Sequence, residues 1–124
     1  MSKTPMISIV DDDESVREST KALVRSLGYS ARTFSSAEEF LDSDAGETSC
    51  LILDVQMKGL SGVELLERLI AEGRRTPVIV VTAFPDERVR NRVLDTGAIG
   101  FLQKPFSDEK LARCLDTALA NYPS

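Results

Sequence analysis

The chain has 124 residues, of which 42% are hydrophobic and 28% charged, a balance that fits one globular domain and argues against intrinsic disorder. Its formal net charge of −5 argues against direct binding to nucleic acid or to an anionic membrane surface. The absence of histidine excludes Ser-His and Cys-His catalysis, histidine-ligated zinc and a phosphohistidine within this chain.

Apolar runs alternate with amphipathic stretches from one end of the chain to the other. The runs predict β-strands at about 6–10, 30–34, 50–54, 78–82 and 100–103. The stretches between them predict helices at about 15–27, 36–43, 61–72, 86–96 and 107–121. The third and fourth runs are apolar without alternation, which is typical of parallel strands covered by helices on both faces. Five β-α units with right-handed crossovers predict a doubly wound α/β fold.

The helices carry their own start signals. A Ser-x-x-Glu pattern predicts a capping box at the start of the first three, at Ser15–Glu18, Ser36–Glu39 and Ser61–Glu64. Ser107 predicts a simpler cap for the last helix. The buried faces of the first and third helices are expected to reach Leu27 and Ile70, and Gly28 and Gly73 are expected to end these helices. The fourth helix is densely charged and is expected to be largely solvated.

Chemically distinctive residues stand where the expected strands end. Asp11 and Asp12 follow the first strand, Asp54 closes the third, Thr82 closes the fourth and Lys104 follows the fifth. The carboxyl ends of parallel strands share one edge of the sheet, so these side chains are expected to meet there. Carboxylates that are brought together repel one another, which favours a hard cation such as Mg²⁺ among them.

The same set of side chains fits a phosphoryl group. Asp54 can attack phosphorus to give an aspartyl phosphate, while Lys104 and the hydroxyl of Thr82 contact the phosphoryl oxygens. Asp13 completes a run of three acids, but its position favours a solvated residue at the helix entry over a metal ligand.

At these positions the chain closely resembles the receiver domain of two-component response regulators. The resemblance covers essentially the whole chain and is carried by the segments Ile9-Val10-Asp11-Asp12-Asp13, Leu53-Asp54-Val55-Gln56-Met57, Gly59-Leu60-Ser61-Gly62, Val81-Thr82-Ala83, Gly97-Ala98 and Lys104-Pro105-Phe106. The segment from Ser35 to Leu41 is most similar to the FixJ-type branch, whose receivers usually precede a helix-turn-helix DNA-binding domain. The resemblance implies a (βα)5 flavodoxin-like, CheY-like fold with five parallel strands in the order 2-1-3-4-5.

The resemblance also assigns roles. Asp54 is implied to be the phosphoacceptor, with Mg²⁺ held by Asp11, Asp12, Asp54 and the backbone carbonyl of Gln56. Thr82 and Lys104 are implied to contact the phosphoryl group, and Thr82 with the aromatic Phe101 is implied to form the switch. The Lys104-Pro105 peptide bond is expected to be cis. Lys58 stands where many receivers have proline, and its effect on that loop is left open.

The expected function is therefore a phosphorylation-controlled switch rather than an enzyme that turns over an external substrate. A sensor histidine kinase is the expected phosphoryl donor. When phosphorylated, the domain is also expected to form a homodimer through the face made by the fourth helix, the fifth strand and the fifth helix. Residues 1–124 are expected to form the receiver domain, without an output domain in this chain, so that DNA would be reached only through a domain that is absent. The alternative is a single-domain regulator or phosphorelay intermediate that acts by protein–protein interaction.

Two rival classes are disfavoured. Phosphatases with an aspartyl nucleophile usually carry a second aspartate two residues later, where this chain has Gln56. A degenerate receiver that acts without phosphorylation would not need the complete set of acids, threonine and lysine.

Two side chains are expected to set the lifetime of the phosphorylated form. Gln56 and Phe84 border the approach of the hydrolytic water in this family. Gln56 can orient that water by hydrogen bonding, whereas the bulk of Phe84 obstructs its path. We expect the obstruction by Phe84 to prevail, which gives a persistent phosphoprotein.

The remaining features concern compartment and redox state. The chain contains two isolated cysteines, Cys50 and Cys114, and each is typical of a small buried hydrophobe. A disulfide between them is not excluded by sequence, but nothing favours one in a domain with a full-sized core. No apolar stretch approaches a membrane span and no signal peptide is evident, so the cytoplasm is the expected location.

Overall fold

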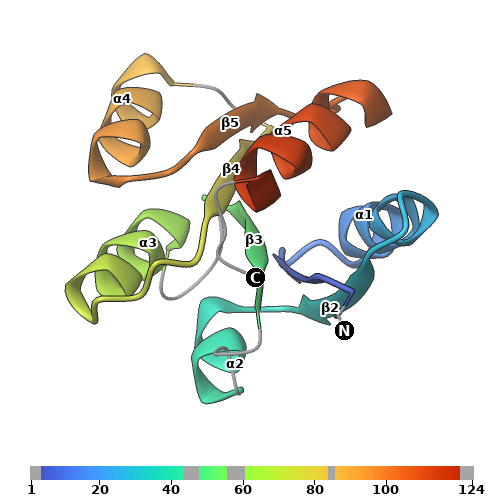
Figure 1. The fold of residues 1–124 in the computed structure, drawn as a ribbon. Coiled ribbons are helices and arrows are strands. Elements are labelled where there is room, and N and C mark those ends of the chain that lie inside the picture. Colours follow the sequence, from blue (N-terminus) through green and yellow to red (C-terminus); the bar gives the residue numbers. More distant parts are fainter. Residues whose placement is uncertain (1–3, 44–47, 56–60, 84–85, 121–124) are drawn as a thin grey trace.

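The computed structural model describes residues 4–43, 48–55, 61–83 and 86–120. Strands and helices alternate strictly along the chain (Figure 1). The strands are β1 (Met6–Val10), β2 (Ser30–Phe34), β3 (Cys50–Asp54), β4 (Val78–Thr82) and β5 (Gly100–Gln103). The helices are α1 (Glu14–Ser26), α2 (Ala37–Asp42), α3 (Gly62–Ala71), α4 (Glu87–Thr96) and α5 (Asp108–Ala120). All five strands coincide with the runs that the sequence predicts.

The strands form one parallel sheet in the order β2-β1-β3-β4-β5. This order and the alternation of strands and helices confirm the expected doubly wound fold. Every residue of β3 and of β4 is buried, as expected for strands covered on both faces. Because β1 pairs with β3 and β3 with β4 in parallel, the carboxyl ends of these three strands lie side by side along one edge of the sheet.

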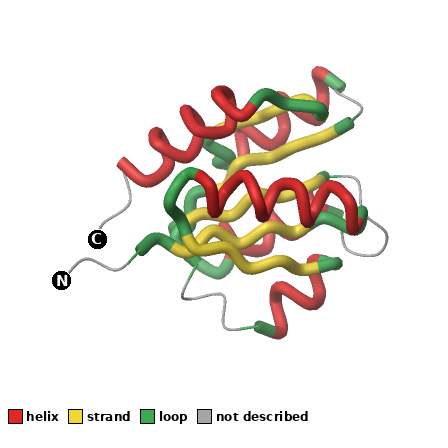
Figure 2. The backbone as a smooth tube through the Cα atoms, turned by 90° about the vertical axis from the view of Figure 1, so that its right-hand side faces the viewer, coloured by secondary structure: helices red, strands yellow, loops and turns green. Residues whose placement is uncertain are grey.

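Successive residues of the central strands belong to two separate hydrophobic clusters, because side chains alternate between the faces of a strand. Leu51 and Leu53 pack with residues of α2, α3 and α4 on one face. Cys50 and Ile52 pack with residues of α1 and α5 on the other face. The helices thus divide three and two over the sheet, and Figures 1 and 2 show these layers on its two sides.

The helix starts agree only in part with the capping signals. α3 has the complete box, in which Ser61 accepts from the amide of Glu64 and the Glu64 carboxylate accepts from the amide of Ser61. α2 has half of it, since Ser36 accepts from the amide of Glu39, whose carboxylate binds Ser35 instead. At the start of α5, Ser107 accepts from the amide of Lys110, as expected.

The predicted box at Ser15 is wrong. Asp13 caps α1 by accepting from the amide of Val16 at 3.1 Å, and Ser15 lies inside the helix. Aspartate is as good a cap as serine, and the turn after β1 is short enough to place Asp13 first. Asp13 is exposed at the helix entry, as the sequence indicated.

The helix ends contain the expected glycines, but two apolar faces are shorter than predicted. Gly28 and Gly73 follow α1 and α3 with positive φ angles of 96° and 74°. Leu27 and Ile70 are 37% and 47% exposed; Leu27 is the C-cap residue of α1, and Ile70 lies in the last turn of α3. Only Val93 is buried on α4, which agrees with a largely solvated helix.

Within the described ranges, no helix is long and apolar enough to cross a bilayer. Cys50 and Cys114 are free thiols. Burial raises the pKa of the Cys50 thiol to about 12 and also raises the pKa of Cys114.

Candidate functional site

Three aspartates meet at the carboxyl edge of the sheet. Asp11 follows β1, Asp12 begins the turn to α1, and Asp54 is the last residue of β3. One carboxylate oxygen from each lies within 4.8 Å of the others. Asp11 and Asp54 are buried, whereas Asp12 is exposed. The parallel pairing of β1 with β3 brings these residues together, as the sequence predicted.

Lys104 brings a positive charge to the site. Its ammonium donates to Oδ2 of Asp11 at 2.6 Å and to Oδ2 of Asp54 at 3.3 Å, and its side chain is 13% exposed. Burial alone lowers the pKa of Lys104, but the hydrogen bond that its ammonium donates to Asp11 and the charge of Asp54 outweigh it, so that the pKa is raised above that of a free lysine. Lys104 is therefore charged at neutral pH and partly neutralises the two buried acids.

The backbone around Lys104 brings it to the site. The Lys104-Pro105 peptide bond is cis, as expected. The Lys104 amide donates to the carbonyl of Thr82 at 2.7 Å, which joins the end of β5 to the end of β4. Thr82 itself is buried, at 1% exposure, on the edge that carries Asp54.

Phe101 is half-buried rather than enclosed. It lies on β5 and packs against the hydrophobic cluster on the side of α2, α3 and α4. The structure therefore places an aromatic side chain on β5, the strand that pairs with β4, which ends in Thr82. Its role as a switch stays a prediction.

The sequence did not indicate how closely α3 approaches the site. The Gly62 amide donates to the carbonyl of Val55 at 3.4 Å. A Cβ atom at Gly62 would come within 2.6 Å of the Val55 Cα and closer still to the Asp54 carbonyl. Glycine is needed here because α3 starts directly against the backbone that carries Asp54. A glycine at the first position of a helix, just after a capping serine, was the available signal.

A second unexpected residue is Arg17 on α1. Its guanidinium donates to the backbone carbonyl of Asp11 at 2.8 Å. Nothing in the spacing of the acids indicated this contact, because it depends on the path of the turn between β1 and α1.

Gln56, Phe84 and Lys58 lie outside the described residues. The predicted carbonyl ligand and the two side chains expected to set the lifetime of the phosphorylated form therefore remain predictions.

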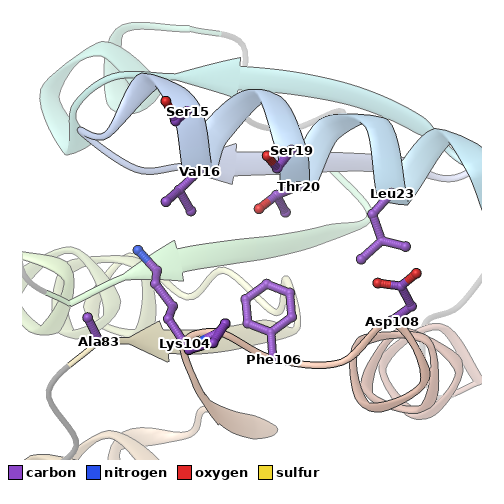
Figure 3. A pocket seen from close by; sticks show the side chains of 10 residues that line it. Ser15, Val16, Ser19, Thr20, Leu23, Ala83, Lys104, Phe106 and Asp108 are labelled. Carbon is purple, nitrogen blue, oxygen red and sulfur yellow. The ribbon is translucent and has the colours of Figure 1, made fainter.

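An open cavity of about 480 Å³ adjoins the site. Figure 3 shows Val16, Thr20 and Leu23 of α1 on one side, with Phe106 of the connection between β5 and α5 facing them. Lys104 also lines this cavity, so the cavity extends to the lysine that contacts Asp11 and Asp54.

The three carboxylates fit a hard divalent cation. Mg²⁺ binds oxygen ligands and usually keeps several water molecules, so that protein atoms rarely supply all of its ligands. Three carboxylate oxygens, one of them from an exposed residue, fit this preference. Lys104 contacts the two buried acids and leaves the exposed oxygens of Asp12 facing solvent. Such an arrangement can hold a cation beside a carboxylate nucleophile and neutralise an incoming phosphoryl group.

The comparisons with known proteins agree with this geometry. Residues 7–116 match the family model described as the response regulator receiver domain. The chain is 38% identical over 115 residues to the transcriptional regulatory protein TdiR of Thauera aromatica, covering 92% of this chain and 51% of TdiR. It is 35% identical over 114 residues to the transcriptional regulatory protein FixJ of Bradyrhizobium diazoefficiens, covering 91% of this chain and 56% of FixJ.

The fold also matches solved structures. The crystal structure of FixJ-N superposes with a TM-score of 0.89 at 30% identity, covering 99% of each chain. The chain thus spans about half the length of the curated relatives it matches and nearly all of a solved receiver fragment.

Proposed function

Because the chain belongs to the receiver domains of two-component response regulators, we propose that Asp54 accepts a phosphoryl group from a sensor histidine kinase in a Mg²⁺-dependent reaction. Receiver domains of this family interact with such kinases and generally bind Mg²⁺ at an acidic pocket. The observation that carries the proposal is the contact of one ammonium with two buried carboxylates, at 2.6 Å and 3.3 Å, beside a third acid.

Each residue has a definite task in this proposal. Asp54 supplies the attacking carboxylate oxygen, which forms a bond to phosphorus while the bond from phosphorus to the donor breaks. Asp11, Asp12 and Asp54 would hold Mg²⁺, which supplies positive charge to the phosphoryl oxygens. Lys104 transfers one of its hydrogen bonds from the Asp54 carboxylate to the phosphoryl group. The Thr82 hydroxyl donates to another phosphoryl oxygen.

The phosphoryl group is then expected to change one face of the domain. If Thr82 moves toward the phosphoryl group, it leaves space that Phe101 can enter from its half-buried position. The face formed by α4, β5 and α5 would change shape as a shift between two populated states, and would bind a second receiver. Sedimentation with and without phosphoryl donor tests this step, and a fully phosphorylated protein that stays monomeric would count against it.

We infer from the relatives which process the phosphorylated domain controls. TdiR and FixJ are transcriptional regulatory proteins about twice as long as the matched region. We therefore propose that the phosphorylated receiver controls transcription through an output domain. The domain itself is proposed to take up and later hydrolyse the phosphoryl group on Asp54, and to turn over no external substrate.

The proposal is tested with acetyl phosphate as a chemical donor and intact mass as the readout. The wild-type chain should gain the mass of one phosphoryl group with Mg²⁺, and should gain none with a chelator in place of the metal. Asp54→Asn is expected to remain unmodified, while Asp13→Asn, which changes an acid at the helix entry, should react as the wild type does. Equal modification of the Asp54→Asn variant would contradict the proposal.

A further inference from the structure

The turn that presents the acid pair depends on contacts outside the sheet. β1 ends at Val10, so Asp11 and Asp12 lie beyond the paired part of the strand. The amide of Asp11 still reaches the next strand, where it donates to the Phe34 carbonyl at 3.1 Å. The amide of Asp13 donates to Oδ1 of Asp11 at 2.9 Å, which fixes the side chain of Asp11 but not the carbonyl from which Asp12 continues.

Arg17 makes the contact that fixes this carbonyl. Its Nη1 donates to the carbonyl oxygen of Asp11 at 2.8 Å, six residues back along the chain. Its own amide donates to the carbonyl of Asp13 at 2.9 Å as the first hydrogen bond of α1. One half-buried residue therefore binds both ends of the turn in which Asp12 lies.

We propose that Arg17 is a positioning residue for the divalent cation site. Its guanidinium holds the Asp11–Asp12 peptide so that both carboxylates face Asp54 before the cation arrives. This inference rests on the proposed function, because it assumes that the aspartates bind Mg²⁺. A turn that is ordered in advance does not have to be ordered by the metal, so the contact with Arg17 raises affinity without touching the ion.

A purely electrostatic role predicts the opposite result. A positive charge near a cation site repels the cation, so removal of that charge alone should strengthen Mg²⁺ binding. Loss of positioning should weaken it. The sign of the change in affinity therefore separates the two explanations.

The test measures the Mg²⁺ dissociation constant by titration calorimetry for the wild type and three variants. Arg17→Met removes both the charge and the hydrogen bond, and is expected to raise the dissociation constant about tenfold, at the lower end of effects seen for residues that support metal ligands. Arg17→Lys keeps the charge and one donor, and is expected to recover most of the affinity. Arg25→Met removes an exposed arginine about 12 Å farther along the same helix, and should bind as the wild type does.

Urea unfolding of the metal-free variants separates positioning from a general loss of stability. A merely structural role would lower the urea midpoint and leave the Mg²⁺ affinity of the folded protein unchanged, and that result would overturn the inference. Should Arg17→Met not fold, Arg17→Gln is judged by the same criterion, since it lacks the charge and is too short to keep the same contact.

The remaining outcomes are also decisive. A wild type that binds no Mg²⁺ would overturn both the proposed function and this inference. A wild type that binds Mg²⁺, together with an Arg17→Met variant that binds it as tightly or more tightly, would overturn the inference alone.

Discussion

Replacement of Lys104 by methionine should destabilise the metal-free protein and make its stability depend more strongly on Mg²⁺. The ammonium of Lys104 lies between two buried carboxylates, those of Asp11 and Asp54, whose side chains are 3% and 6% exposed. Methionine fills a similar volume but removes the ammonium that contacts both acids. The substitution therefore tests electrostatics rather than packing.

The size of the effect follows from the geometry. The carboxylate oxygens lie within 4.8 Å of one another, and two unit charges at that separation or closer repel by at least about 3 kcal/mol at an effective dielectric constant of 20. Loss of one partner from a buried ion pair typically costs about 3–5 kcal/mol. We expect the metal-free Lys104→Met variant to lose about 3 kcal/mol in free energy of unfolding, which lowers its melting temperature by about 10 °C.

The assay is urea unfolding at neutral pH with chelator and with millimolar Mg²⁺. Mg²⁺ should stabilise Lys104→Met by more than it stabilises the wild type, because the cation takes over the neutralisation of the two acids. Lys110→Met removes an exposed lysine from the first turn of α5, and should change neither the stability nor the response to Mg²⁺.

An unchanged urea midpoint for metal-free Lys104→Met would refute the electrostatic reasoning. An equal gain in free energy of unfolding on addition of Mg²⁺ to the variant and to the wild type would also refute it.

A pH series adds an internal check, because the pKa of Lys104 is raised in the folded protein. The stability it contributes is complete below the ordinary lysine pKa of about 10.4, and is lost as the pH rises through the higher folded pKa. Lys104→Met should lack this alkaline loss.

Three further predictions concern other parts of the domain. Gly62→Ala should lower the free energy of unfolding by about 3 kcal/mol, since its methyl group overlaps the backbone at the end of β3; a urea midpoint within error of the wild type would contradict this. Cys50 should resist iodoacetamide at pH 8 until urea is added, because burial raises its pKa to about 12, whereas half-buried Cys114 should react slowly; rapid native modification of Cys50, seen by peptide mass, would contradict its burial. Phe84→Ala should speed the loss of phosphate after donor removal, and Gln56→Ala should have the smaller effect; a slower Phe84→Ala variant would refute the steric argument.

Most of the fold could be predicted because each strand has a local signal. The uninterrupted apolar runs of β3 and β4 are long enough to identify, and α3, the helix between them, has a clear apolar face. Helix ends were less certain, because two good caps, Asp13 and Ser15, stand two residues apart at the start of α1. Only the length of the turn from β1 decides between them.

The site could be predicted to the extent that it depends on strand ends. Asp11, Asp54 and Lys104 meet because parallel strands end at a shared edge, which follows from the fold class alone. The contact of Arg17 with the turn and the close approach of Gly62 could not be predicted, because both depend on the distance between backbone segments that are not paired in the sheet.

The most direct test of the proposed function localises the phosphoryl group. The wild-type chain is treated with acetyl phosphate and Mg²⁺, the acyl phosphate is reduced with borohydride, and the modified residue is identified by peptide mass spectrometry. We predict a single modified residue, Asp54, and no modification when a chelator replaces Mg²⁺. Modification at another acid with Asp54 intact, or labelling of Asp54 that does not depend on the metal, would contradict the proposed role of Asp54.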